Sequence, residues 1–161
     1  MTITLRPAGA PDAEAVAQVL IESRNALLPF APMAHPAAEV RTWIATVLIP
    51  AGGVHLAICE GQTVGVLALS HQAGQAWIDQ LYVRPGHTGQ GIGAQLLQLA
   101  HRQLQPPIRL CTFQANTGAR RFYERHGYRA IALTDGADNE ERCPDVLYEW
   151  HGATTEEGRM K

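Results

Sequence analysis

The 161-residue sequence is poor in cysteine and lysine, and it has no long hydrophobic run. Its three cysteines, Cys59, Cys111 and Cys143, form no CxxC pair, which argues against a disulfide framework or a zinc site. No two histidines have the i, i+4 spacing of a helical metal site, so we expect no metal. No segment reaches the ~18 apolar residues needed to span a bilayer, and the N-terminus lacks the pattern of a signal peptide. We therefore expect a cytoplasmic protein without a membrane partner.

The charge balance excludes one further class of partner. The formal net charge is −2 and no run of basic residues forms a phosphate-binding stripe, so we expect no nucleic-acid partner. Hydrophobic residues make up 46% of the chain and charged residues 17%, which is typical of a globular protein. We predict a single domain over residues 1–150. Residues 151–161 have no periodicity and are expected to form a flexible tail.

The hydrophobic pattern predicts alternating helices and strands. A strand is expected at residues 2–6 and a helix after Pro11, followed by a proline-rich loop and a second helix at 37–49. Three apolar runs separated by short turns predict antiparallel strands at 54–60, 63–71 and 76–83. The remaining elements are expected in the order helix 92–104, strand 109–114, helix 117–126, strand 128–134 and strand 146–150.

The segment VRPGHTGQGIGAQLL, residues 83–97, places a glycine-rich turn between a strand and an amphipathic helix. Glycines let the backbone approach a ligand, and the free N–H groups of a helix N-terminus favour a phosphate. A P-loop would need Lys and Ser or Thr after Gly93, where Ala94 and Gln95 stand. A dinucleotide fold would need the glycines directly after the strand and an acid ~20 residues on, and neither is present. A turn whose glycines only allow close helix packing remains open at this point.

A second motif, NTGARRFYERHGY at residues 116–128, follows the turn. Together with TGQGIG it resembles the GNAT acetyltransferase superfamily, whose members combine a loop of the form Q/R-x-x-G-x-G/A with the motif N-x-x-A-x-x-F-Y-x-x-x-G-F/Y. Thr88 stands where the family usually has Arg or Gln. The resemblance covers residues 77–128.

The resemblance implies an α+β fold with a mixed, mostly antiparallel sheet of six to seven strands, flanked by about four helices and splayed between two central strands. Acetyl-coenzyme A would enter that splay. The strand before the loop would carry a bulge over Leu81–Val83 whose backbone groups hold the pantetheine arm and polarise the carbonyl. The coenzyme-binding residues implied by the resemblance are Leu81, Tyr82, Val83, Thr88, Gly89, Gln90, Gly91, Ile92, Gly93, Ala94 and Asn116.

The resemblance also implies the chemistry. Tyr123 would be the general acid, because a phenol keeps its proton at neutral pH; its alternative role is that of a core aromatic. Asp79 is a candidate proton relay, with a chain of water molecules as the alternative. Asn116 has the alternative role of a helix N-cap. Arg120 and Arg121 are adjacent on a helix, so we expect at most one to reach the coenzyme phosphates.

The acceptor is the least defined part of the site. The candidate acceptor residues are Phe30, His35, Trp77, Glu140 and Asp145. The acid-rich segment 135–145 would suit a cationic amine, or it is ordinary solvated surface. We predict transfer of an acetyl group to an amine of a small molecule or peptide in a ternary complex. The alternatives are a non-catalytic acyl-coenzyme A sensor and a transferase for a larger acyl group. Exposed edge strands can pair with those of a second copy of the chain, so a homodimer is a further candidate partner.

Overall fold

The computed structural model describes residues 2–27, 31 and 33–152. Phe30 and residues 153–161 of the predicted tail therefore lie outside the described residues. The elements follow in the order β1 (Ile3–Pro7), a 3-10 turn (Ala10–Asp12), α1 (Ala13–Ala26), α2 (Ala37–Trp43), a π-helical turn (Ile44–Leu48), β2 (Val54–Cys59), β3 (Gln62–Gln72), β4 (Gln75–Val83), α3 (Ile92–Gln103), β5 (Ile108–Phe113), α4 (Thr117–Arg125), β6 (Arg129–Thr134) and β7 (Asp145–Trp150).

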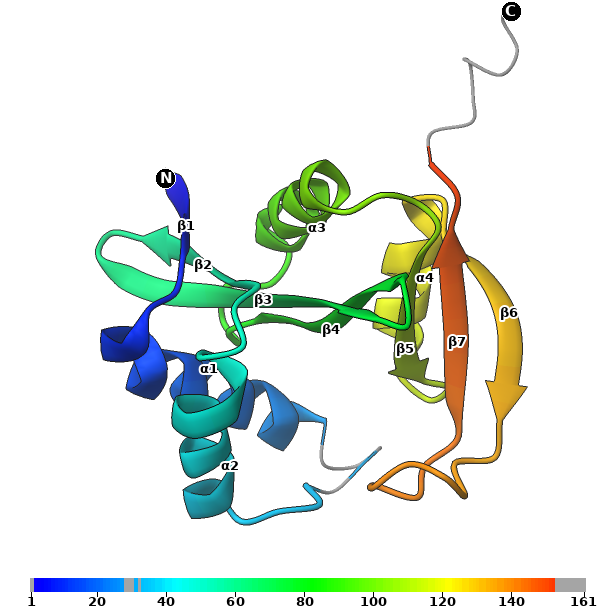
Figure 1. Cartoon of the computed structure of the whole chain (residues 1–161), viewed down its shortest axis with the longest axis horizontal. Helices are drawn as coiled ribbons and strands as arrows, with labels where there is room; N and C mark the ends of the chain where they lie inside the picture. The colour runs from blue at the N-terminus through cyan, green and yellow to red at the C-terminus, as the bar shows by residue number, and fades with distance from the viewer. Residues whose placement is uncertain (1, 28–30, 32, 153–161) are drawn as a thin grey trace, which may run out of the picture.

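The seven strands form one sheet in the order β1-β2-β3-β4-β5-β7-β6, shown in Figure 1. All neighbouring strands are antiparallel except β4 and β5, which run parallel. The α+β class and the mostly antiparallel sheet predicted above are thus confirmed. β1 and β6 are the two edges. The register of β6 against β7 shifts at Ile131, and such a bulge disfavours pairing with another strand edge. The homodimer stays a prediction.

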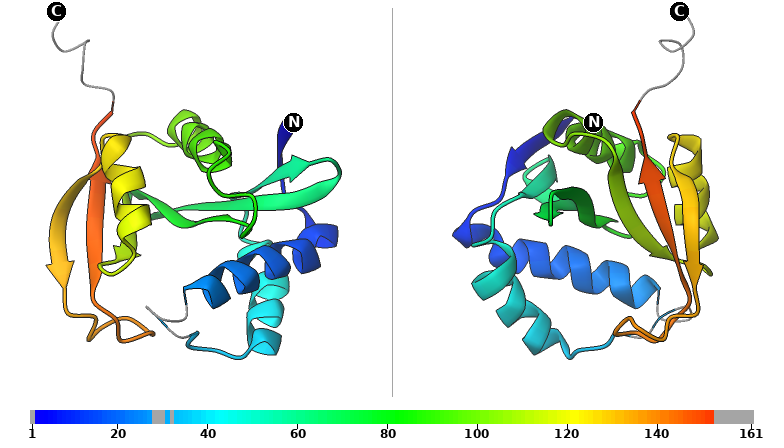
Figure 2. Two further views of the ribbon diagram at one scale, coloured as in Figure 1. Left: turned by 180° about the vertical axis from the view of Figure 1, so that it is seen from behind. Right: turned by 45° about the vertical axis from the view of Figure 1, so that its right-hand side comes forward.

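Helices cover both faces of the sheet, as the two views in Figure 2 show. The apolar side chains Val16, Val19 and Leu20 of α1 pack with Val66 of β3 on one face. Leu96 of α3 and Tyr123 of α4 pack on the opposite face with the other large cluster of buried residues. Because it is covered on both sides, β3 is buried continuously from Thr63 to Leu69 and lacks the alternation of a half-exposed strand. Among the described helices, none has both the length and the hydrophobicity needed to cross a bilayer.

The parallel pair β4 and β5 is joined over a short stretch. Their register contains two residue pairs, Ala76 with Ile108 and Trp77 with Arg109. Beyond Trp77 the two strands separate, and in Figure 1 β5 turns away from the direction of β4. This separation is the predicted splay, and the candidate site is built around it.

Candidate active site

The splay between β4 and β5 contains a cavity of about 630 Å³, here called the splay cavity. Its walls come from the end of α1, the second half of β4, the second half of β5 and the start of α4. Leu81 and Val83 line it together with Tyr123 and Ala119. The same four residues also line a second cavity of about 580 Å³, the loop cavity, so the two cavities adjoin at these residues. The loop and the splay are thus neighbouring parts of one candidate site.

The backbone of β4 offers polar groups to the splay. Arg84 donates its backbone N–H to β3 at 2.7 Å, and hydrogen bonding to β3 alternates along an antiparallel strand. Tyr82 therefore pairs with β3, whereas the backbone groups of Leu81 and Val83 turn toward the splay. Ser23 on α1 agrees with this direction, since its Oγ donates to the Val83 carbonyl oxygen at 3.3 Å. Two of the three residues predicted for the pantetheine arm thus point their backbone N–H groups away from β3 and toward the splay, with no strand partner among the described residues.

The predicted bulge over residues 81–83 was misplaced. The register between β3 and β4 shifts two residues earlier and leaves Asp79 as the extra residue, since Ile78 and Gln80 face consecutive residues of β3. A bulge increases the local twist of a strand. Its position just after Trp77 places the added twist where β4 leaves β5.

The loop cavity surrounds the glycine-rich turn at the N-terminus of α3. Gly89 and Gly91 have φ of +77° and +83°, a left-handed conformation that side chains rarely adopt, and a Cβ on either would meet no atom within 4 Å. Both line the loop cavity, together with Thr88. The first N–H groups of α3 have no partner within the helix and are available to an anion. The structure thus favours the ligand-cradle interpretation for these two glycines.

Close helix packing, the alternative role for the glycines, applies at one position. A Cβ on Gly93 would lie 3.4 Å from the ring of Phe122, so α3 and α4 approach each other there. Ile92, Gly93 and Ala94 also line the loop cavity. Gln90 is exposed and lines none of the three cavities described in this section.

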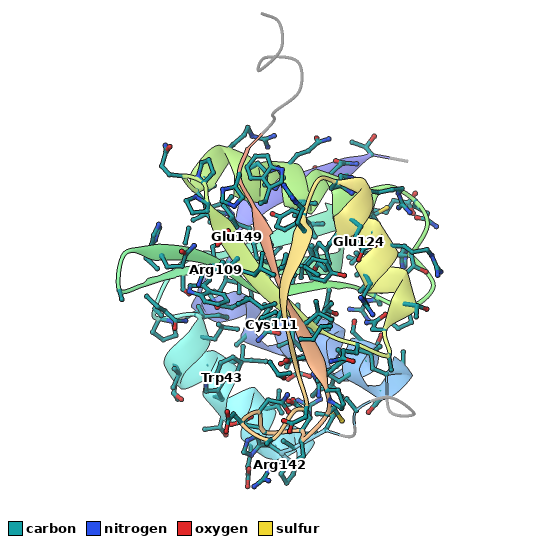
Figure 3. All side chains as sticks on the ribbon, turned by 90° about the vertical axis from the view of Figure 1, so that its right-hand side faces the viewer. Trp43, Arg109, Cys111, Glu124, Arg142 and Glu149 are labelled. Atoms are coloured by element: carbon teal, nitrogen blue, oxygen red, sulfur yellow. The ribbon has the colours of Figure 1, made fainter. Side chains whose placement is uncertain are left out.

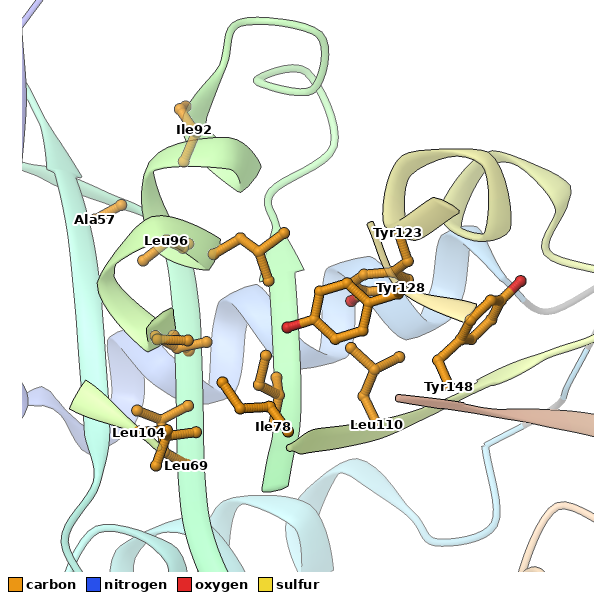
Figure 4. Packing of buried hydrophobic residues seen from close by; sticks show 14 of the residues in the cluster. Ala57, Leu69, Ile78, Ile92, Leu96, Leu104, Leu110, Tyr123, Tyr128 and Tyr148 are labelled. Carbon is orange, nitrogen blue, oxygen red and sulfur yellow. The ribbon is translucent and has the colours of Figure 1, made fainter. Parts of the chain in front are cut away.

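Tyr123 stands where the splay cavity and the loop cavity meet. Its side chain is 8% exposed and packs with the rings of Phe122, Tyr128 and Tyr148 at centroid distances of 5.2, 5.6 and 6.2 Å. Figure 4 shows Tyr123 and Tyr128 next to each other above Leu110 of β5. Burial raises the pKa of the Tyr123 phenol well above its usual value. Within the described part of the chain its hydroxyl makes no hydrogen bond, so its proton is available to a ligand.

Asn116 caps α4 and also lines the splay cavity, while its predicted contact with the coenzyme stays a prediction. Its Oδ1 accepts a hydrogen bond from the backbone N–H of Ala119 at 3.2 Å, which caps α4. Asn116 also lines the splay cavity. Because the cap uses the side-chain oxygen, the amide N–H groups remain for a ligand.

We expected at most one of Arg120 and Arg121 to reach the coenzyme phosphates, and the structure places both outside the lining of the loop cavity. Arg120 donates to the Tyr148 hydroxyl at 3.1 Å and to the Gln114 carbonyl oxygen at 3.5 Å, and neither Arg120 nor Arg121 lines the loop cavity. Arg125, one helical turn after Arg121, does line it. Sequence analysis did not single out Arg125, because the side of α4 that lines the cavity is defined only by the packing of α4 against α3.

Asp79 lines the splay cavity, and its side chain is open to that space. The protein walls desolvate the carboxylate in part and raise its pKa above the usual range. A carboxylate with a raised pKa is a stronger base than a free one. Asp145, predicted on the acceptor side, also lines the splay cavity and accepts hydrogen bonds from Thr134 and Asn139.

A third space, the outer cavity, has a volume of about 480 Å³ and lies between α1, α2 and the loop before β7. His35 and Glu140 both line it, with His35 Nε2 3.3 Å from Glu140 Oε1 and His35 Nδ1 3.1 Å from Glu39 Oε1. Glu140 and then Glu39 raise the pKa of His35. Trp43, 39% exposed, supplies an aromatic wall, and Figure 3 shows it projecting from α2. Trp77, in contrast, lines none of the three cavities.

Arg24 separates the outer cavity from the splay cavity and lines both. Its guanidinium pairs with Glu141 at 2.9 Å and lies 5.4 Å from the centroid of the Phe113 ring. The nearby Tyr82 hydroxyl and Glu141 carboxylate raise the pKa of Arg24 against its partial burial. Sequence analysis did not single out Arg24, because its partners are far away in the chain.

Charges are distributed unevenly along the three cavities. Acids line the splay cavity and the outer cavity, namely Asp79, Asp145, Glu141, Glu39 and Glu140. The described lining of the loop cavity contains no acid, but it includes Arg125, His87 and His126. An anionic ligand group therefore fits the loop cavity and a cationic group fits the other end. No three His, Cys, Asp or Glu side chains of the described residues are grouped to hold a metal ion.

Comparison with known proteins agrees with this geometry. The sequence profile described as the acetyltransferase (GNAT) family matches residues 20–128. No curated protein sequence matches the chain.

Solved structures with the same fold were found at low sequence identity. The apo form of YjaB from Escherichia coli is 23% identical, with 95% of this chain and 100% of that chain covered and a TM-score of 0.74. PaiA N-acetyltransferase from Thermoplasma acidophilum, in complex with coenzyme A, is 19% identical, with 94% and 100% covered and a TM-score of 0.71. An Arabidopsis thaliana protein in complex with the bisubstrate analogue CoA-Ac-MVNAL is 20% identical, with 94% and 100% covered and a TM-score of 0.72.

Proposed function

The chain belongs to the GNAT acetyltransferase family, and on that basis we propose that it transfers an acetyl group from acetyl-coenzyme A to an amine of a small molecule or peptide. The observation that carries this proposal is the place of Tyr123. Tyr123 lines both the loop cavity, which fits phosphates, and the splay cavity on the acceptor side, and burial keeps its hydroxyl protonated.

The coenzyme supplies a thioester whose carbonyl carbon accepts the amine nitrogen. Its phosphates would lie at Thr88–Ala94 and the start of α3. The backbone N–H groups of Leu81 and Val83, together with Asn116, would hold the pantetheine arm. Those N–H groups would also accept the negative charge that develops on the carbonyl oxygen. The use of coenzyme A is supported by the PaiA structure, which has the same fold and is a complex with coenzyme A.

Two proton transfers complete the proposed reaction. Tyr123 would donate its proton to the sulfur as the carbon–sulfur bond breaks, and would regain it from solvent after the coenzyme leaves. The attacking amine must lose a proton, and Asp79 would accept it directly or through water. The raised pKa of Asp79 suits that role, because a stronger base takes a proton from an ammonium group more readily.

We propose that the acceptor enters through the outer cavity and reaches the thioester past Arg24. The outer cavity combines an apolar wall at Trp43 with the acidic groups Glu39 and Glu140, so it suits an amine that carries an apolar body. His35 would help to hold it. Asp145 would act from within the splay cavity. The Arabidopsis neighbour supports a ternary complex, since its analogue joins the coenzyme to a peptide.

Release of free coenzyme A thiol with a panel of amines tests the proposal. The panel should contain cationic arylalkylamines, polyamines, free amino acids and short peptides, each with acetyl-coenzyme A at saturation. We expect thiol release with at least one amine and an acetylated product in the mass spectrum. Binding of the coenzyme without thiol release from any amine would favour the sensor alternative. Repeating the assay with propionyl and succinyl donors separates acetyl transfer from transfer of a larger group.

A further inference from the structure

The segment TGQGIG, residues 88–93, contains no basic side chain, and Arg84 before it is paired with Glu22. Thr88 occupies the position at which the resembling family usually has Arg or Gln, and its hydroxyl carries no charge. Backbone N–H groups can bind phosphate oxygens, but they do not balance the full charge of a phosphorylated ligand. A ligand bound in the loop cavity would therefore need a cation from another element.

Most arginines that the structure describes already have partners. Arg24, Arg84 and Arg109 pair with glutamates at 2.9, 3.0 and 2.7 Å. Arg6 and Arg41 likewise pair with carboxylates. Arg120 is bonded to the Tyr148 hydroxyl. Within residues 2–27, 31 and 33–152, five arginines have a guanidinium group without a hydrogen bond or ion pair. They are Arg102, Arg121, Arg125, Arg129 and Arg142.

Of these five, Arg125 alone lines one of the three cavities, and it lines the loop cavity. The position of Arg125 on α4 explains why it lines this cavity. Gly118, Phe122 and Arg125 follow at spacings of four and three residues, so they share one side of the helix, and all three line the loop cavity. The glycine-rich turn and the start of α3 line the same cavity. Arg125 and the N-terminus of α3 therefore border one space.

The surroundings leave Arg125 free to bind an anion. The loop cavity has no acidic residue in its described lining that would compete for the guanidinium. His126 is adjacent, but its Nδ1 is held by the Phe122 carbonyl oxygen at 2.8 Å. A guanidinium binds phosphate through two parallel hydrogen bonds, which favours Arg for this role.

We propose that Arg125 binds a phosphate group of the coenzyme, supplying from α4 the positive charge that the turn lacks at Thr88. This inference rests on the proposed function, because it takes acetyl-coenzyme A as the ligand of the loop cavity. The ligand chemistry is a phosphate ester or anhydride, which coenzyme A carries both as its pyrophosphate and as its 3′-phosphate.

The test is calorimetric titration of the full chain with coenzyme A, 3′-dephospho-coenzyme A and pantetheine. Four proteins are compared: wild type, R125Q, R125K and the matched control R121Q. Arg121 is on the same helix, is exposed and has no side-chain partner among the described residues, but it lies outside the loop cavity. We expect R125Q to weaken coenzyme A binding by about three- to thirtyfold, the range of one charge-assisted contact that is partly screened. R121Q should bind coenzyme A with wild-type affinity, and all variants should bind pantetheine as the wild type does. The affinity of R125K for coenzyme A should lie between those of R125Q and wild type.

The ligand series identifies the phosphate and can overturn the inference. If R125Q weakens coenzyme A but not 3′-dephospho-coenzyme A, the contact is with the 3′-phosphate; if it weakens both alike, the contact is with the pyrophosphate. Equal affinities of R125Q and wild type for coenzyme A would refute the role of Arg125 while leaving the proposed function intact. Failure of the wild type to bind coenzyme A would refute the proposed function itself, and this inference with it.

Discussion

At the scale of single residues, Tyr123 combines a core position with a place at the site. Its ring is packed among Phe122, Tyr128 and Tyr148, so its direction is fixed by the core. Its hydroxyl has no hydrogen-bond partner among the described residues, and Tyr123 lines both cavities. Such a residue is pre-positioned, because the packing that holds the ring places the hydroxyl with few alternative conformations.

We predict that Tyr123→Phe lowers turnover by roughly ten- to a thousandfold, the scale of general acid catalysis, and leaves coenzyme affinity nearly unchanged. Phe keeps the ring contacts and removes only the proton donor. Thiol release at saturating acceptor measures the first effect, and calorimetric titration with coenzyme A measures the second. The unfolding temperature serves as the control for a purely structural role. Wild-type turnover in the variant would exclude Tyr123 from the mechanism and leave the proton transfers to water or Asp79.

At the scale of secondary-structure elements, the turn before α3 requires glycine for its backbone. Gly91 is the N-cap of α3 and has φ of +83°. Gly74, in the hairpin between β3 and β4, has φ of +81° and equally open space around its Cβ position, but lines none of the three cavities. A side chain at either position meets the same backbone strain. Only at Gly91 would it also enter the loop cavity.

We therefore predict that Gly91→Leu abolishes measurable coenzyme binding, whereas Gly74→Leu retains it. Each substitution should lower the free energy of unfolding by about 1 kcal/mol, because leucine disfavours a left-handed conformation. Denaturant unfolding compares the two stabilities, and calorimetric titration compares the two affinities. Wild-type affinity in Gly91→Leu would show that no phosphate lies at this turn.

A second junction of elements joins α3, β6 and β7 away from the site. His101 of α3 stacks on Trp150 of β7 with 3.7 Å between ring centroids and 6° between planes. Its Nε2 is 2.8 Å from the hydroxyl of Tyr128, just before β6. Burial and then the charge of His126 lower the pKa of His101 to about 4. The folded protein thus keeps His101 neutral, while the unfolded chain binds a proton below its ordinary pKa of about 6.5.

Because the folded pKa is the lower one, the contribution of His101 to stability is complete above about pH 6.5 and is lost as the pH falls toward about 4. We predict that the free energy of unfolding decreases by about 1–2 kcal/mol over this interval, after allowing for partial exposure of the ring. His101→Gln keeps a hydrogen-bond acceptor for Tyr128 but does not titrate, so its stability should vary less with pH. His71→Gln, which retains His101, should keep the wild-type slope.

Urea unfolding at several pH values between 4 and 7.5 measures the slopes. Asp12 does not contribute to these slopes. Arg6 lowers its pKa to about 2, so the contribution of Asp12 to the free energy of unfolding is lost only below the unfolded pKa of about 4. Equal slopes for wild type and His101→Gln would contradict the assigned pKa shift.

The elements also show which parts of the site can be predicted from sequence. The turn, α3 and Tyr123 depend on local signals, namely glycine spacing, a 3.6-residue period and the second motif. The bulge at Asp79 depends on the register between two strands, which no local pattern defines. Arg24 and Glu141 meet although 117 residues separate them, so their pairing requires the folded chain. Arg125 was overlooked because its role depends on the space between α3 and α4.

At the scale of the whole molecule, the site lies at the weakest connection within the sheet. Strands β1–β4 and the group β5, β7 and β6 are hydrogen bonded to each other through only the two residue pairs at the start of β4 and β5. The splay cavity lies directly beyond those pairs and is lined by residues from both groups. A ligand in this cavity contacts both parts of the sheet. Because the coenzyme would bind in this separation and contact both parts of the sheet, its binding should change the stability of the fold.

We predict from this arrangement that coenzyme A or acetyl-coenzyme A raises the unfolding temperature of the whole chain in one transition. A ligand that binds only the folded state adds about 2.7 kcal/mol at a concentration one hundred times its Kd, which for a chain of this size corresponds to about 5–10 °C. Thermal unfolding followed by circular dichroism, with ligand from micromolar to millimolar, measures the shift.

Gly91→Leu is the control. Because the leucine blocks its loop cavity, adding the coenzyme should not change the unfolding temperature of this variant. Because both parts of the sheet contact the ligand, the transition should stay single as it moves. An unmoved transition of the wild type at millimolar coenzyme would require the coenzyme assignment to be abandoned, since binding to the folded state cannot occur without this stabilisation.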